Sequence, residues 1–204
     1  MNQKGKQIAL KAIYKAYAQD PAFERLRTDP PQPKRVVPGR GSMSPKLVLV
    51  GEAPGRMEAS TRKPFMGAAG QVLNKLLASI DLERKDVFIT NAVKYRPTIG
   101  QVTVRNRTPT PDEWRASRPY LLDELGVFHD VPVVLLGKVA AATMMTFMES
   151  VPMHELHGHL YSGPGRRDYT VLYHPAAAVY QPELLEVMLE DMQAVRTRVG
   201  ASVA

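Results

Sequence analysis

The sequence predicts an α/β protein, a three-layer α/β/α sandwich around a central four-stranded parallel sheet. Four short apolar runs rich in Val, Leu and Ile have the length and composition of strands buried on both faces. Segments with helical spacing of apolar residues separate these runs, as expected when helices connect parallel strands. A length of 204 residues with 44% apolar residues suits one domain with a sizeable core. We therefore expect a single domain over residues 1–204.

The first 45 residues differ from the rest. Apolar and basic residues recur at helical spacing over Gln7–Ala18, which predicts a helix. Residues 29–46 are rich in Pro, Gly and Ser, which predicts a long irregular connection. The domain is thus expected to consist of an N-terminal helix and Pro-rich connection (1–45) followed by a core (46–199).

The core alternates strand and helix. Thr110 is a suitable N-cap and Pro111 a suitable first helical residue for the second core helix. In chain order we expect a strand at Lys46–Val50, a helix at Gln71–Ile80, a strand at Val87–Thr90, a helix at Pro111–Leu125, a strand at Val133–Leu136, a helix at Val139–Met148, a strand at Tyr169–Tyr173 and a helix at Glu183–Val199.

Composition limits the classes of function. The chain has no cysteine, which excludes disulfides, thiolate nucleophiles and cysteine-ligated iron–sulfur or zinc sites. It has no apolar run long enough to span a membrane, and Met1–Lys6 lacks the features of a signal peptide, so we expect a cytoplasmic protein without membrane association. A net charge of +7 favours a polyanionic partner, although a basic protein with simply solvated cations is the alternative.

Three of the four strands end in loops whose residues can bind a ligand or take part in catalysis: Gly51–Gly55, Asn91–Lys94 and His174–Ala177. Ligands of open parallel sheets bind beyond the carboxyl ends of the strands, where these loops would meet. The convergence of the loops at one edge is the physical reason to expect one site there.

Each residue of this expected site also has a structural alternative. The Gly51–Gly55 turn can donate backbone amides to a ligand, or it can be an ordinary βα turn. Phe65, which precedes the small residues 67–70, can stack on a base or pack in the core. Asn91 can pair with a pyrimidine edge, matching uracil O4 and N3–H, or cap a turn. His174 can donate to a carbonyl oxygen that gains negative charge, or be a satisfied, partly buried side chain.

Four motifs occur in order: Gly51-Glu-Ala-Pro-Gly-x-x-Glu58, Pro64-Phe-x-Gly-x-Ala-Gly70, Asn91-x-x-Lys-x-Arg-Pro97 and His174-Pro-Ala-Ala177. Together they closely resemble the family 4 uracil-DNA glycosylases, the iron–sulfur branch of that superfamily. The resemblance runs from about Val36 to Val179. Each motif alone is weak, but four in register form a specific pattern.

The resemblance implies a role for each site residue. Gly51, Ala53 and Gly55 would hold a flipped base and the attacking water through backbone amides, with Glu52 at the water-activating or electrostatic position. Glu58 would lie near uracil C5 and exclude the methyl group of thymine. Phe65 would stack on uracil, Asn91 would read its Watson–Crick edge, and His174 would stabilise charge on O2. Pro175, Ala176 and Ala177, with the chain to Val179, would lie along the DNA and enter the emptied space.

The sequence departs from the family at its iron–sulfur cluster. Tyr95 and Ser117 stand where the family places cluster cysteines, and the N-terminal cysteine pair is also absent. We therefore expect no cofactor and no metal, and expect packing that involves Tyr95 and Trp114 to replace the cluster. His154, His157 and His159 lack the spacing of a helical metal site.

Basic residues outside the motifs are candidates for DNA contact. The segment Tyr95–Thr108 is longer than in typical members, and its Arg96, Arg105 and Arg107 are expected to contact the DNA backbone, with a solvated basic loop as the alternative. Arg166 and Arg167 are further candidates for phosphate contact. No His lies between Asn91 and Pro119 and position 53 is Ala, which argues against the covalent DNA trap of a related branch.

The leading hypothesis is a monofunctional glycosylase that removes uracil from single- or double-stranded DNA and leaves an abasic site. Lys94 is the one candidate for the amine nucleophile of a lyase, so a lyase activity stays an alternative. The alternatives are a glycosylase for another deaminated or modified base, and a protein that binds uracil-DNA without cutting it. We expect a monomer of bacterial, archaeal or phage origin with DNA as its partner.

Overall fold

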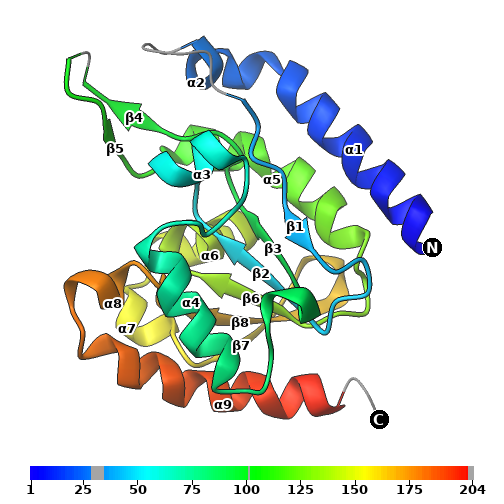
Figure 1. Cartoon of the computed structure of the whole chain (residues 1–204), viewed down its shortest axis with the longest axis vertical. Coiled ribbons are helices and arrows are strands. Elements are labelled where there is room, and N and C mark those ends of the chain that lie inside the picture. The colour runs from blue at the N-terminus through cyan, green and yellow to red at the C-terminus, as the bar shows by residue number, and fades with distance from the viewer. Residues whose placement is uncertain (29–34, 101, 202–204) are drawn as a thin grey trace.

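The computed structural model describes residues 1–28, 35–100 and 102–201. Its centre is a six-stranded mixed sheet with the strand order β1-β3-β2-β6-β8-β7 (Figure 1). The four inner strands, β2 (Leu47–Gly51), β3 (Val87–Asn91), β6 (Val133–Leu136) and β8 (Arg167–Leu172), are parallel. The predicted four-stranded parallel sheet is thus confirmed as the core of a larger sheet.

Two antiparallel edge strands correct the predicted strand count. β1 (Arg40–Gly41) pairs with β3 and β7 (Leu160–Gly163) pairs with β8. β1 has only two residues and lies in the segment expected to be irregular throughout. β7 lies where we expected a loop, and its residues are partly or fully exposed, so no buried apolar run marks it in the sequence.

Helices cover both faces of the sheet and create the predicted three layers (Figure 1). The helices are α1 (Gln3–Gln19), α2 (Glu24–Thr28), α3 (Arg56–Thr61), α4 (Ala68–Ala78), α5 (Pro111–Gly126), α6 (Lys138–Met144), α7 (Met153–Leu156), α8 (Ala177–Tyr180) and α9 (Leu184–Ala201). Short 3₁₀ turns occur at Pro21–Phe23, Arg84–Asp86, Thr146–Glu149 and Pro164–Arg166. No helix in these described ranges has the length and apolar character needed to cross a membrane.

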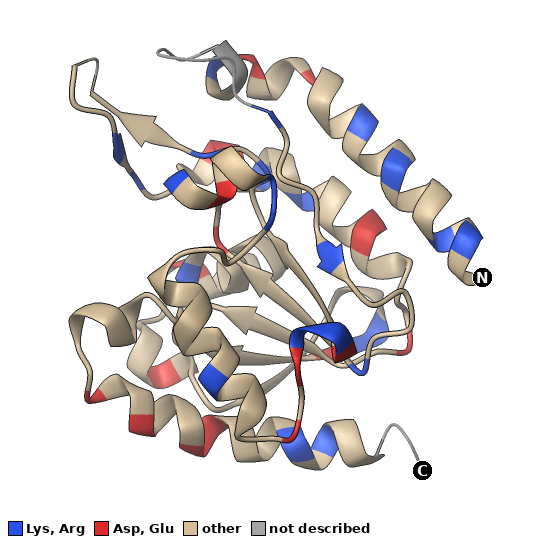
Figure 2. Cartoon of the chain, viewed as in Figure 1, with Lys and Arg blue, Asp and Glu red and all other residues tan. Residues whose placement is uncertain are grey.

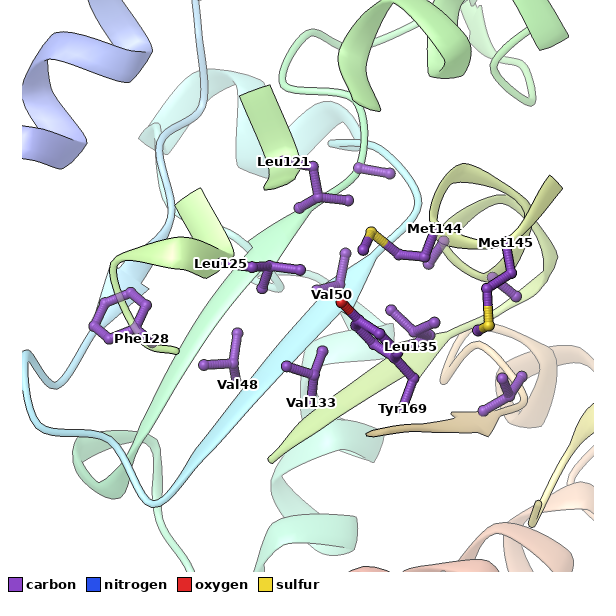
Figure 3. Packing of buried hydrophobic residues seen from close by; sticks show 14 of the residues in the cluster. Val48, Val50, Leu121, Leu125, Phe128, Val133, Leu135, Met144, Met145 and Tyr169 are labelled. Carbon is purple, nitrogen blue, oxygen red and sulfur yellow. The ribbon is translucent and has the colours of Figure 1, made fainter. Parts of the chain in front are cut away.

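The alternation of side chains along the strands divides the core into two clusters. Val48 and Val50 face the layer of α5 and α6, where they pack with Leu121, Leu125 and Met144 (Figure 3). Leu47 and Leu49 face the opposite layer, where α4 and α9 supply apolar residues such as Leu73, Leu76, Met188 and Met192.

The sequence predicted several boundaries well. Thr110 caps α5 as expected: its side chain accepts from the Glu113 amide while the Glu113 carboxylate accepts from the Thr110 amide. The helix expected over Val139–Met148 instead ends at Met144 and is followed by a 3₁₀ turn. A hairpin of β4 (Thr98–Ile99) and β5 (Arg105–Asn106) forms the long segment after β3, and it was not predicted.

A third cluster joins α1 to the loop after β3. Its large rings, Tyr17, Phe23, Tyr95 and Trp114, are buried, and we call them the aromatic nucleus. The Tyr17 ring stacks on Phe23 with 4.2 Å between centroids and on Tyr95 with 5.5 Å. The Tyr17 hydroxyl bonds Ser117 Oγ at 2.8 Å and accepts from the Lys94 amide at 3.0 Å.

Two positions where the resemblance implies cluster cysteines, 95 and 117, lie at the aromatic nucleus. The Tyr95 and Ser117 positions carry no thiolate, and Tyr17 fills the space between them with a ring contact to one and a hydrogen bond to the other. A chain without cysteine cannot bind the cluster of the related family. Tyr95 and Trp114 are both in the nucleus, as the sequence predicted.

Candidate active site at the carboxyl edge of the sheet

A cavity of about 300 Å³ opens at the carboxyl edge of the sheet, and residues of all three predicted loops meet there. Ala53 and Gly55 come from the loop after β2, Asn91 ends β3, and His174 follows β8. The other lining residues are Arg56, Met57, Glu58, Phe65, Gly67, Ala68, Ala69, Asn106, Ala176, Val179 and Tyr180. The volume of this cavity is at the lower end of the range for pockets that bind small molecules.

Gly51 allows Asn91 and Phe65 to approach each other. β2 and β3 pair with Gly51 opposite Asn91. A Cβ at Gly51 would lie 2.4 Å from Asn91 Oδ1 and 2.8 Å from the Phe65 ring, so any side chain there would displace one of them. Asn91 is 3% exposed, and within the described ranges no hydrogen bond engages its side-chain amide. Its donors and acceptor are therefore available to a ligand.

Phe65 is held in a strained backbone conformation. Its φ of 54° is in the left-handed region, which non-glycine residues rarely adopt. The Arg84 guanidinium stabilises this turn, since it donates to the carbonyl oxygens of Phe65 at 2.6 Å and Gly70 at 3.2 Å and to Asn74 Oδ1 at 2.7 Å. The Phe65 ring thereby stands almost parallel to the His174 ring, with 5.5 Å between centroids and 23° between planes.

Glu58 closes the cavity from α3. Its Oε1 accepts from the amides of Met66 at 3.0 Å and Gly67 at 3.2 Å. The side chain thus lines the cavity and also fixes the loop that carries Phe65.

His174 is held in one tautomer. The Ala176 amide donates to His174 Nδ1 at 3.1 Å, so the neutral ring carries its proton on Nε2. Burial lowers the pKa of His174 to about 4, which keeps the ring neutral at physiological pH. The site therefore contains a neutral imidazole with one N–H donor beside the Phe65 ring.

Glu52 lies beside the cavity but not in its wall. Its Oε1 accepts from the Val139 amide at 3.2 Å, at the start of α6. Burial raises the pKa of Glu52, and hydrogen bonds from the Val139 and Lys138 amides oppose this rise. Gly137, at a φ of 91°, separates Glu52 from His174: a Cβ there would lie 2.4 Å from Glu52 Oε1 and 2.9 Å from His174 Cβ.

Lys94 points away from the cavity. Its side chain is fully buried, and its ammonium donates to Glu124 Oε2 at 2.5 Å, to the Asn91 carbonyl at 2.5 Å and to Thr90 Oγ1 at 2.9 Å. Burial lowers the pKa of Lys94, while Glu124 opposes that effect. Lys94 thus supports the backbone beneath Asn91.

The predicted DNA-contact arginines separate into groups. Arg96 donates to Asn106 Oδ1 at 2.6 Å, close to the cavity, and Arg105 is exposed on β5. Arg107 forms a two-pronged pair with Glu113, at 2.7 and 2.5 Å. Arg166 ends the 3₁₀ turn before β8 and Arg167 begins β8, about 20 Å of strand away from His174. The structure therefore does not join these last two to the cavity, and their contact with DNA stays a prediction.

Pro175, Ala176 and Ala177 follow His174 as expected, with Ala176 in the cavity wall and Ala177 at the start of α8. Val179, expected to lie along the DNA, is also in the wall, whereas the sequence analysis did not single out four other wall residues: Arg56, Met57, Asn106 and Tyr180. Tyr180 is 84% exposed at the rim. Its place in the chain, six residues after His174, is the only signal that could have suggested it. Asn106 arrives through the unpredicted hairpin.

Comparison with known proteins gives this geometry a family. A family model described as the uracil DNA glycosylase superfamily matches residues 38–195. The chain is 36% identical to the type-4 uracil-DNA glycosylase of Pyrobaculum aerophilum over 78% of this chain and 81% of that protein. It is 38% identical to the type-4 uracil-DNA glycosylase of Archaeoglobus fulgidus over 78% of this chain and 79% of that protein. It is 31% identical to the type-5 uracil-DNA glycosylase of Thermus thermophilus over 81% of each chain. With this match and this arrangement of loops, the chain belongs to the uracil-DNA glycosylase superfamily.

Proposed function

We propose that this protein hydrolyses the N-glycosidic bond of deoxyuridine in DNA and leaves an abasic site. The observation that carries the proposal is the neutral, Nε2-protonated His174 beside Phe65, in a cavity that also receives Asn91. A base inside a duplex is inaccessible, so the target nucleotide is flipped out of the helix into this cavity.

The cavity supports recognition of a small pyrimidine. Phe65 offers an aromatic face for stacking, and the Asn91 amide pairs with uracil O4 and N3–H. Glu58 fills the wall between α3 and the Phe65 loop, where its carboxylate is fixed by the Met66 and Gly67 amides. A rigid group at that point excludes the additional methyl group of thymine.

The electrostatics of the site suit departure of an anionic base. Breaking the glycosidic bond produces an oxocarbenium-like sugar and a uracil anion. His174 donates from Nε2 to uracil O2 as negative charge develops there. Glu52 acts on the sugar side, where a carboxylate of raised pKa stabilises positive charge or accepts a proton from the attacking water.

The environment of Lys94 supports a monofunctional hydrolase. A lyase requires an accessible amine, whereas the Lys94 ammonium is fully buried and paired with Glu124. Water is then the nucleophile, and the strand remains intact at the abasic site.

The test is excision from oligonucleotides that contain uracil, hypoxanthine or a thymine mispair, followed by alkali to break abasic sites. We expect breaks at uracil alone, and none without alkali. The His174→Ala and Asn91→Ala variants should each lower the single-turnover rate at least about 100-fold, because they remove anion stabilisation or base pairing in the site. His129→Ala is the matched control, since His129 is exposed and pairs with Asp130 on another surface.

Each other outcome has a definite meaning. Tight binding of uracil-DNA without excision would replace the proposal by a non-catalytic sensor. Breaks at hypoxanthine or another base but not at uracil would keep the reaction and change the substrate. Near-normal rates in both His174→Ala and Asn91→Ala would refute the site assignment.

A further inference from the structure

A second, larger cavity of about 800 Å³ lies beyond the C-terminal end of α3, between α1 and the segment 35–43. Its floor is apolar and aromatic, with Leu10, Tyr14, Val36 and Met43. Five basic residues form its rim: Lys11, Lys15, Arg35, Arg40 and Arg62. We call this feature the cationic groove.

The charge of the groove is not neutralised locally. All five basic residues are exposed, and no Asp or Glu among residues 1–28, 35–100 and 102–201 lines the cavity. In the part of the chain that the structure describes, none of the five forms an ion pair. Lys and Arg lie along α1 and on β1 beside this groove, whereas the first half of α9 is acidic (Figure 2). An open furrow lined by one sign of charge attracts and concentrates polyanions.

The groove continues toward the active site. A hollow of about 360 Å³ shares Arg40 and Gly41 with it and adds Lys63, Met66 and Arg84. Met66 stands between Phe65 and Gly67, which both line the active-site cavity. On a second route, α3 begins at Arg56 in the active-site wall and is followed directly by Arg62 on the rim of the groove. Basic residues thus lie along a track from α1 toward the active-site cavity, on both of these routes.

Part of this track is outside the region that the family model matches. The model begins at residue 38, so α1 and Arg35 precede it. α1 is nevertheless fixed firmly: the Lys6 ammonium donates to the Met43 carbonyl at 2.9 Å and Tyr17 enters the aromatic nucleus. The helix therefore presents Lys11 and Lys15 from a rigid position.

We propose that the cationic groove binds the phosphate backbone of single-stranded DNA that flanks the nucleotide in the active site. The inference rests on the proposed function for its direction, since it extends the same substrate. The groove volume of about 800 Å³ suits a short stretch of one flexible strand, whose phosphates the exposed cations of the rim can follow. Cations around an apolar floor are the combination that tracks single strands without reading sequence.

Equilibrium binding of fluorescein-labelled, uracil-free DNA tests the groove separately from catalysis. The probes are single strands of about 6 and about 20 nucleotides and a duplex of about 20 base pairs, which bracket the site sizes of single-strand proteins. The variant carries Lys11→Glu, Lys15→Glu and Arg35→Glu. The control carries Lys4→Glu, Lys46→Glu and Lys75→Glu, which change charge equally at exposed positions outside both cavities.

We expect the protein to prefer the long single strand, and the groove variant to lose at least about tenfold in affinity for it. The slope of log K against log salt should fall by about 2, because three contacts each contribute about 0.7 on a single strand. The control variant should retain most of the affinity for the long single strand and most of the salt dependence. Equal losses in the variant and the control would overturn the proposal in favour of a net-charge effect, and stronger binding of the duplex would overturn the single-strand assignment.

The two proposals fail in different ways. If the protein excises uracil but neither binding nor excision depends on the groove residues, the proposal of DNA binding in the groove is overturned and the proposed function stands. Groove-dependent binding of single strands by a protein that excises no uracil overturns the proposed function alone.

Discussion

At the scale of single residues, the site depends on one hydrogen bond. The Ala176 amide occupies His174 Nδ1, which directs the ring proton to Nε2 and into the site. Burial then keeps the ring neutral, with a pKa of about 4 compared with an ordinary 6.5. A neutral donor stabilises an anion without the large cost of burying a cation.

This shift predicts the acid limb of the pH profile. Because the folded-state pKa is about 4, excision that depends on neutral His174 should persist as pH falls through 6.5 and decline only near pH 4. The unfolded chain takes up this proton at higher pH, so the contribution to stability is complete above 6.5 and is lost as pH falls toward 4. Single-turnover rates and an NMR titration of the His174 ring measure both. A ring pKa at or above 6 would contradict the burial argument.

Tyr180 provides a second prediction at this scale. It is 84% exposed at the cavity rim, directly after the chain that is expected to enter the space left by a flipped base. We expect Tyr180→Ala to slow excision from duplex more than from single-stranded substrate, because only the duplex must be opened. Stability should change by less than about 0.5 kcal/mol, as for exposed positions generally. Equal slowing on both substrates would assign Tyr180 to base binding instead.

At the scale of elements, one arginine outside the motifs organises the loop that carries Phe65. Arg84 lies in the 3₁₀ turn before β3 and reaches the loop 64–70 through several hydrogen bonds. The turn thus connects the strand that ends in Asn91 to the loop that supplies Phe65. Burial lowers the pKa of Arg84, while Glu58 opposes that effect.

We expect Arg84→Ala to cost about 1–3 kcal/mol of stability, because it removes hydrogen bonds from a charged group to carbonyl oxygens. Excision should fall at least about tenfold, because misplacement of a stacking group by a fraction of an ångström weakens the reactive geometry. Arg84→Lys should recover little, since an ammonium lacks the planar fork. Lys85→Ala is the control, because Lys85 is exposed and pairs with Glu83 at the surface. Urea denaturation measures the loss of stability, and single-turnover excision measures the loss of activity. Normal activity in Arg84→Ala would show that the loop holds its shape without the guanidinium.

At the scale of the whole molecule, the aromatic nucleus joins the N-terminal helix to the core. Tyr17 is fully buried, and its hydroxyl bonds α5 through Ser117 and the loop after β3 through Lys94. The same loop positions Asn91 through the Lys94–Glu124 pair. The stability of α1 and the position of Asn91 are therefore physically connected.

We expect Tyr17→Ala to lower the free energy of unfolding by about 3–5 kcal/mol, as for other large buried aromatic residues. Tyr17→Phe should cost about 1–2 kcal/mol, since it keeps the ring and removes the hydroxyl. Thermal and urea denaturation measure both. A loss below about 1 kcal/mol for Tyr17→Ala would mean that the nucleus contributes little to the fold.

The sequence was sufficient for features set by local patterns. Buried runs such as Val133–Leu136 and the Thr110 cap are determined by neighbouring residues, and both were predicted. The convergence of Gly51, Asn91 and His174 followed from parallel topology alone. The edge strand β7 was missed because its residues are partly or fully exposed. The hairpin was missed because each of its strands has only two residues. Arg84 and Asn106 were missed because their partners are distant in the chain, 10 residues or more apart.

The aromatic nucleus also makes the protein convenient for spectroscopy. A fold that is stabilised by rings in place of thiolates tolerates a chain without a single sulfhydryl group. One cysteine introduced at Val102, which is 99% exposed near the tip of the hairpin, would be the sole site for a maleimide dye. The fluorescence of that dye would follow the approach of the hairpin to DNA in real time, with no background labelling to subtract.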